Sequence, residues 1–154
     1  MNVEIDHIPK DKNMHDILHR VGINAKPETV FASLATIDGL RRWWVSATTG
    51  TASKGGTINF EFCDMQVLAA DSTLVHWRCV RGPAEWLGTE IKFVLEWKRD
   101  QTFVMFFHTN WKEPVEFMHH CSTKWATFLL SLRDAIETGA GKPAPHDLKI
   151  HVGD

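Results

Sequence analysis

The stretch TEIKFVLEWKRDQTFVMFFH, residues 89–108, predicts two β-strands joined by one turn. Its first half alternates apolar side chains with Lys92 and Glu96, which is the two-residue period of a strand with one buried face. A turn of two or four residues at Arg99 and Asp100 sets the pairing as Trp97 with Thr102, Leu95 with Val104, Phe93 with Phe106, and Ile91 with His108. This register directs His108 to the buried face and leaves Phe103, Met105 and Phe107 on the outer face.

Earlier segments repeat the same alternation. Strands are expected in DILHRVGIN (16–24), in KGGTINFEF (54–62), after a turn at Cys63 and Asp64, and in TLVHWRCV (73–80). The turn at Cys63 and Asp64 is expected to pair Phe62 with Met65 and Phe60 with Val67, so that all four side chains point inward.

Two segments of the sequence have the periodicity of helices. AKPETVFASLATI (25–37) has a proline where a first helical turn tolerates it, and the helix is expected to break around Gly39 before a second short helical stretch. Residues 115–138 repeat apolar side chains every three or four positions, which predicts a long amphipathic helix. The fold class is therefore α+β, with a curved antiparallel sheet of about six or seven strands, two short helices after the first strand, and one long C-terminal helix around which the sheet wraps.

The chain length of 154 residues suits one domain. We expect a flexible N-terminal arm at 1–15, the folded domain at 16–143, and a solvated C-terminal tail at 144–154.

Composition excludes several classes of partner. The formal net charge is −2 with scattered Lys and Arg, which argues against binding to nucleic acid or an anionic membrane. No apolar run is long enough to span a membrane. Three cysteines without paired motifs indicate buried thiols in a reducing compartment, so a cytoplasmic location is expected.

Tryptophan is unusually frequent. The chain has seven Trp and nine Phe but no Tyr, and two of the tryptophans, Trp43 and Trp44, are adjacent. Neighbouring residues cannot both point into one core, so at least one indole needs a second environment. Either one of them covers a sheet edge, or one lies at the mouth of a ligand pocket.

The order of these motifs resembles a known superfamily. AKPETVFASLATIDGLRRWW, GGTINFEF, LVHWRCV, GTEIKFVLEW, the run from Thr102 through His108 to Trp111, and KWATFLLSLRDAIETGAGKP together are similar to the START/SRPBCC helix-grip proteins. The nearest branch resembles the C-terminal domain of the activator of heat-shock-protein-90 ATPase. The resemblance covers residues 16–143 and implies an apolar cavity between the sheet and the long helix.

The expected ligand contacts combine this implied cavity with the inward faces. They are Trp43, Trp44, Trp77, Phe93, Phe106, His108, Trp111, Met118, Ser122 and Trp125. His108 and Ser122 are the polar members of the set. No metal site and no cofactor are expected, because the consecutive His119, His120 and Cys121 fan around a helix and no metal-binding spacing is present.

Three functions remain open at this point. The leading hypothesis is binding of a hydrophobic small molecule, aromatic, acyl or lipid-like, in the cavity. The second is a cyclase-type or hydrolase-type enzyme that uses His108. The third is a protein-interaction module related to chaperone ATPase activation, or a homodimer, formed through the outer sheet face.

Overall fold

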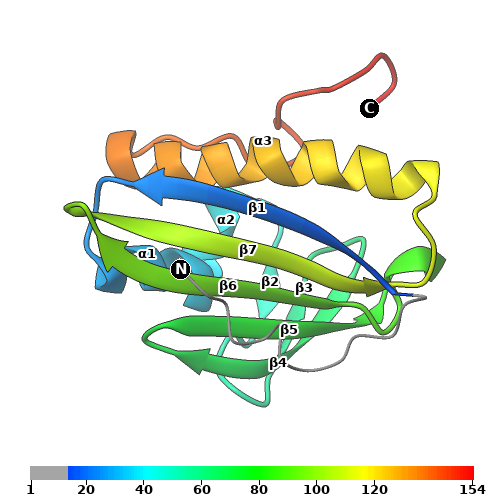
Figure 1. Cartoon of the computed structure of the whole chain (residues 1–154), viewed down its shortest axis with the longest axis horizontal. Helices are drawn as coiled ribbons and strands as arrows, with labels where there is room; N and C mark the ends of the chain where they lie inside the picture. Colours follow the sequence, from blue (N-terminus) through cyan, green and yellow to red (C-terminus); the bar gives the residue numbers. More distant parts are fainter. Residues whose placement is uncertain (1–13) are drawn as a thin grey trace.

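A seven-stranded antiparallel sheet, ordered β1-β7-β6-β5-β4-β3-β2, carries the fold in the computed structural model, which describes residues 14–154 (Figure 1). The strands are β1 (His15–Ile23), β2 (Thr49–Gly50), β3 (Thr57–Asn59), β4 (Asp64–Asp71), β5 (Leu74–Arg81), β6 (Glu90–Lys98) and β7 (Gln101–Trp111). The first and last strands of the chain are neighbours, and α3 runs beside β1 along the curved sheet (Figure 1). The α+β helix-grip architecture predicted from the sequence is confirmed.

The helices are α1 (Pro27–Ala35), α2 (Ile37–Arg41), the short 3₁₀ helix η2 (Ala84–Trp86) and α3 (Glu116–Thr138). Helix α2 begins where the hydroxyl of Thr36 accepts a hydrogen bond from the backbone N–H of Gly39, at 3.0 Å. Helix α3 ends at Gly139, whose φ of 84° is the left-handed conformation that glycine adopts without strain. Among residues 14–154, no helix combines the length and apolar character needed to cross a membrane.

The β6–β7 hairpin has the register predicted from the sequence. Phe93 pairs with Phe106 and Ile91 with His108, around a two-residue turn. Arg99 and Asp100 in this turn have φ values of 55° and 58°, as a tight hairpin turn requires. The indole of Trp97 lies beyond the core at the end of the strand, and the Lys26 ammonium lies 4.4 Å from its ring centroid.

The predicted register of the β3–β4 hairpin is wrong. Met65 pairs with Ile58 rather than with Phe62, and residues 60–63 form the connection. Asn59 stabilises this longer turn because its side-chain amide donates to Asp64 at 2.7 Å. Phe60 consequently stays in the core, whereas Phe62, expected to point inward, is 44% exposed.

The outer face of β7 is less open than its sequence suggested. Phe103 and Phe107 are only 6% and 8% exposed. Three cationic side chains lie over the Phe103 ring, those of Arg20, Lys98 and Arg99. A continuous exposed aromatic stripe is therefore not present on this strand.

The C-terminal segment is docked rather than solvated as the sequence suggested. Ala144 forms a parallel bridge with Val45, and its backbone N–H donates to the Trp44 carbonyl at 2.7 Å. The segment then turns back along α3 (Figure 1). Lys124 of α3 donates hydrogen bonds to Asp147, to the Leu148 carbonyl at 2.9 Å and to Asp154 at 2.8 Å. These bonds fix the segment against the helix.

Candidate functional site

Both adjacent tryptophans are buried in one core, so the expectation that neighbouring residues could not share it is wrong. Trp43 is completely buried, and its Nε1–H donates to the Ser33 carbonyl of α1 at 2.8 Å. Trp44 stacks on Trp43, with ring centroids 6.1 Å apart, and on Trp77, with ring centroids 5.9 Å apart and planes only 3° from parallel. Trp43 thus joins α1 to the core, and Trp44 extends the core toward a pocket.

This pocket has a volume of about 320 Å³ and lies between α3, η2, the β3–β4 connection and the docked C-terminal segment. Its walls are mostly aromatic, and the Trp and Phe residues that line it are Trp44, Phe62, Trp86, Phe117, Trp125 and Phe128. Phe62 contacts the other rings edge-on, with its centroid 5.5 Å from that of Trp86 and 6.0 Å from that of Trp44. The exposed position of Phe62 places it at the rim of the pocket.

One end of the pocket is polar. His120, Lys124, Asp147 and Asp154 line it. The hydrogen bond from Lys124 lowers the pKa of the Asp154 carboxyl to about 2. Burial works to raise the pKa of Asp147, but hydrogen bonds from Lys124 and Lys149 outweigh it, so that pKa also lies below its usual value. Both carboxylates are therefore ionised at neutral pH, and all three donors of Lys124 are in use.

A buried donor in this region lacks a strong acceptor. The indole of Trp86 is 4% exposed and lines the pocket, and its Nε1–H has no oxygen or nitrogen acceptor among residues 14–154; its side-chain partner is the sulfur of Cys121, a weak acceptor. Leaving a buried donor without a good acceptor costs about 1–3 kcal/mol. Trp77 and Trp111 also have Nε1–H groups without a partner among the residues described, but neither residue lines the pocket. A hydrogen-bond acceptor on a bound molecule would satisfy the Trp86 donor.

His108 lies in the core and does not line this pocket. It is completely buried, and burial lowers its pKa to about 3, so the imidazole is neutral. Nδ1 accepts a hydrogen bond from Trp125 Nε1 at 3.1 Å, which leaves the ring proton on Nε2. That nitrogen donates to the Thr89 hydroxyl at 2.8 Å, and this hydroxyl donates to the Trp86 carbonyl at 2.6 Å. The histidine thus positions η2 through Thr89.

Of the ten ligand contacts expected from the sequence, Trp44 and Trp125 line the pocket. The other eight lie elsewhere: Trp43, Trp77, Phe93, Phe106, His108, Trp111, Met118 and Ser122. The first six of these are at most 1% exposed, because aromatic rings fill the space between sheet and helix where a cavity was expected. Met118 packs against the core, and the Ser122 hydroxyl contacts His19 Nε2 at 3.2 Å. Ligand contact by any of the ten stays a prediction.

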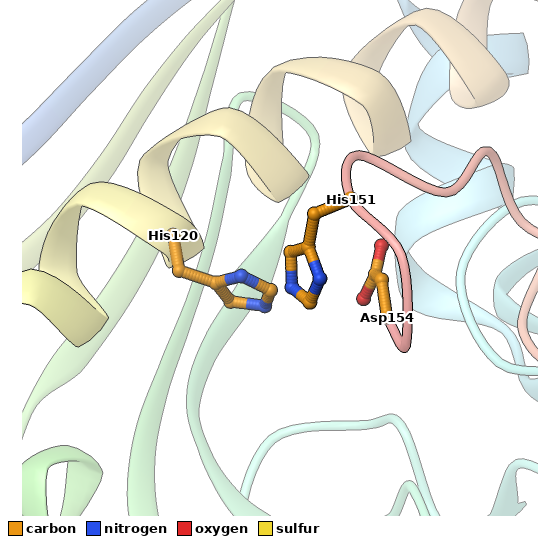
Figure 2. Close-up of side chains that lie close together, drawn as sticks. All are labelled: His120, His151 and Asp154. Atoms are coloured by element: carbon orange, nitrogen blue, oxygen red, sulfur yellow. The ribbon is translucent and has the colours of Figure 1, made fainter.

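Several wall residues were missed in the sequence. Trp86 could have been found from the sequence, because it is a large aromatic residue in the loop RGPAEWLG, marked by Gly and Pro, rather than on the inner face of a strand. Asp147 and Asp154 had none, since their ion pairs with Lys124 span 23 and 30 residues. The same docking brings His151 of the tail near His120 of α3, and with Asp154 they form a group of potential metal ligands (Figure 2).

The three cysteines are free and buried. Burial raises the pKa of the Cys121 thiol, which lines the pocket, to about 12. Burial likewise raises the pKa values of Cys63 and Cys79. All three are therefore protonated at neutral pH, and the pocket contains no thiolate nucleophile.

Comparisons with known proteins agree with this fold. No family model and no curated protein matches the chain. Among solved structures, the Aha1 dimer from Colwellia psychrerythraea is 46% identical, with a TM-score of 0.75, and the match covers 82% of this chain and 99% of that one. SSP2350 from Staphylococcus saprophyticus is 18% identical, with a TM-score of 0.70 and coverage of 84% and 98%. CalU16 from Micromonospora echinospora is 17% identical, with a TM-score of 0.69 and coverage of 80% and 75%, so the last two show the fold alone.

Proposed function

The chain belongs to the Aha1 family within the helix-grip (SRPBCC) proteins, and from that premise we propose that it binds a neutral, compact, aromatic small molecule in the pocket beside α3. The observation that carries the proposal is an aromatic-walled pocket in which the Nε1–H of Trp86 has no oxygen or nitrogen acceptor among the residues described. Ligand sites typically combine apolar walls with a few oriented polar groups. We place the protein in the cytoplasm under the same proposal, in keeping with its three free thiols.

The size of the pocket favours a compact ligand. A volume of about 320 Å³ lies at the lower end of the range for small-molecule sites, which is roughly 300–1,000 Å³. Such a space suits one fused-ring system, whereas a long acyl chain would extend into solvent. Six aromatic side chains also favour ring stacking over aliphatic packing.

The charges of the pocket favour a neutral ligand. Lys124 is the cation at its polar end, and Asp147, Asp154 and a carbonyl oxygen take all three of its donors. An anionic ligand would have to displace one of two carboxylates from Lys124, while a cationic organic ligand would have to compete with Lys124 for the same carboxylates. A neutral carbonyl or ether oxygen can accept from Trp86 without disturbing this network.

Replacing Phe62 with serine tests the pocket. The probe is 6-propionyl-2-dimethylaminonaphthalene, a neutral fused aromatic ketone whose fluorescence shifts to the blue in apolar surroundings. Removing the Phe62 ring takes away about 1.4 kcal/mol of apolar contact, so the affinity should fall about tenfold in a fluorescence titration. The matched control is Trp97→Ser, because Trp97 is aromatic, similarly exposed at 42%, and outside the pocket. Equal affinities of the two variants would contradict the proposed site.

A homodimer is the second candidate, because the 46% identical relative is described as a dimer. Leu18 offers an apolar contact on the outer face of β1, where it is 60% exposed and pairs with Phe107. Size-exclusion chromatography with light scattering should give a dimeric mass for the wild type and a monomeric mass for Leu18→Asp. A monomeric wild type that also leaves the ATPase rate of a heat-shock-protein-90 chaperone unchanged would contradict both the homodimer hypothesis and the chaperone-interaction hypothesis.

A further inference from the structure

We propose that His120, His151 and Asp154 bind one divalent transition-metal ion, with Zn²⁺ as the best-suited ion, between α3 and the C-terminal segment. One ligand atom from each residue lies within 4.8 Å of the others. Figure 2 shows the His120 ring reaching out from α3 toward the His151 ring, with the Asp154 carboxylate on the far side of His151. Two imidazoles and a carboxylate are a ligand set that zinc accepts, usually with a water in the fourth position.

Each residue has a donor atom available. His151 Nδ1 lies 2.8 Å from the Val152 carbonyl, so it carries the ring proton and leaves the Nε2 lone pair free. Asp154 uses only Oδ2 for hydrogen bonds, and its Oδ1 accepts none from the residues described. The His120 ring contacts Phe117 and His151 but makes no hydrogen bond within residues 14–154.

Two hydrogen bonds already orient the Asp154 carboxylate. Lys124 donates to Oδ2 of Asp154 at 2.8 Å, and the backbone N–H of Ile150 donates to the same oxygen at 2.9 Å. Partners of this kind hold a metal ligand in place and commonly strengthen binding. The positive charge of Lys124 is balanced by Asp147, so Asp154 is not the sole counter-charge of this lysine.

Binding requires only a small contraction of the group. Zinc bonds of about 2.1 Å in tetrahedral geometry place neighbouring ligand atoms about 3.4 Å apart. His151 is exposed, so a change of its side-chain rotamer can close the remaining gap. Nitrogen ligands favour zinc and its transition-metal neighbours over Mg²⁺ and Ca²⁺, which prefer oxygen.

The consequence is a metal-dependent attachment of the tail. An ion shared by α3 and the C-terminal segment would hold residues 150–154 on the helix. Since His120 and Asp154 also line the aromatic pocket, the ion would stabilise one wall of it. The metal site does not depend on the small-molecule proposal, because its three ligands are present whether or not the pocket is filled.

Isothermal titration of the tag-free, metal-stripped full chain with zinc chloride at pH 7.5 tests the proposal. We expect one ion per chain, and an affinity at least tenfold weaker in His151→Ala and in Asp154→Asn. His146→Ala is the matched control, because His146 is an exposed histidine of the same segment outside the group. Its affinity should stay within twofold of the wild type.

A second measurement detects the attachment directly. Zinc should slow hydrogen exchange of the Ile150 amide in the wild type and in His146→Ala, but not in His151→Ala. The proposal is overturned if the wild type takes up no stoichiometric zinc. It is also overturned if His151→Ala and His146→Ala bind zinc equally well, which would indicate dispersed surface histidines.

Discussion

Replacing His108 with alanine should lower the free energy of unfolding by about 4 kcal/mol. The substitution opens a cavity in a fully buried site and leaves the Trp125 Nε1–H without its acceptor. It also removes the donor that holds the Thr89 hydroxyl, and through it the Trp86 carbonyl. Urea unfolding followed by far-ultraviolet circular dichroism measures the change.

The exposed His146 supplies the control for this variant. His146→Ala should change the unfolding free energy by less than about 0.5 kcal/mol, as is usual for surface substitutions. A catalytic histidine at an open site would behave differently from a buried one, because its loss would spare stability. A near-wild-type unfolding curve for His108→Ala would contradict the structural role given to His108.

The dependence of the unfolding free energy on pH should also depend on His108. The pKa of His108 is about 3 in the folded protein against about 6.5 when unfolded, so only the unfolded chain takes up this proton between those values. Stability is unaffected above pH 6.5 and falls as the pH drops below it, by up to about 1.4 kcal/mol per pH unit. Between pH 6.5 and 5, His108→Gln should show a shallower decline than the wild type. Equal slopes would mean that His108 does not stay neutral.

Replacing Gly39 with alanine should destabilise the protein by about 3 kcal/mol. A Cβ atom at this position would lie 2.4 Å from the Ala32 carbonyl oxygen and 2.6 Å from the Ser33 Cα, both in the backbone of α1. Backbone cannot yield as a side chain can, so α2 would have to move away from α1. That shift would also strain the bond from Trp43 to the Ser33 carbonyl.

Asp38→Ala is the control for this second variant. Asp38 precedes Gly39 in the same short helix, and its side chain is 82% exposed. Thermal unfolding should separate the two, with a clear fall in melting temperature for Gly39→Ala and little change for Asp38→Ala. Matching melting temperatures would show that α1 and α2 do not approach as closely as described.

The sequence predicted those parts of the fold in which local signals agree. In the β6–β7 hairpin, the alternation on both strands and a two-residue turn point to one register, which the structure has. The predicted register of the β3–β4 hairpin was wrong because the alternation also fits a register displaced by an even number of residues, which keeps the same faces inward. Asn59 and Asp64 decided between the registers by a side-chain hydrogen bond across the turn.

The candidate site was less predictable than the fold. An excess of aromatic residues indicated a ring-lined interior, but which rings fill the core and which face a pocket depends on sheet curvature and side-chain volume. The rings of Trp77 and Trp111 are buried in the core, while that of Trp86 lies in the pocket wall. The polar end escaped prediction because the docked tail, rather than any local motif, assembles Lys124 with its two carboxylates.

The most direct test of the central claim follows the indole N–H signals in nitrogen-15 correlation spectra while the naphthyl ketone probe is added. The Trp86 signal, assigned by its loss in Trp86→Phe, should shift downfield as its N–H gains an oxygen acceptor. The signal of Trp97, which lies outside the pocket, should stay in place. A Trp86 signal that does not move at saturating probe, or one that moves no more than that of Trp97, would contradict ligand binding in this pocket.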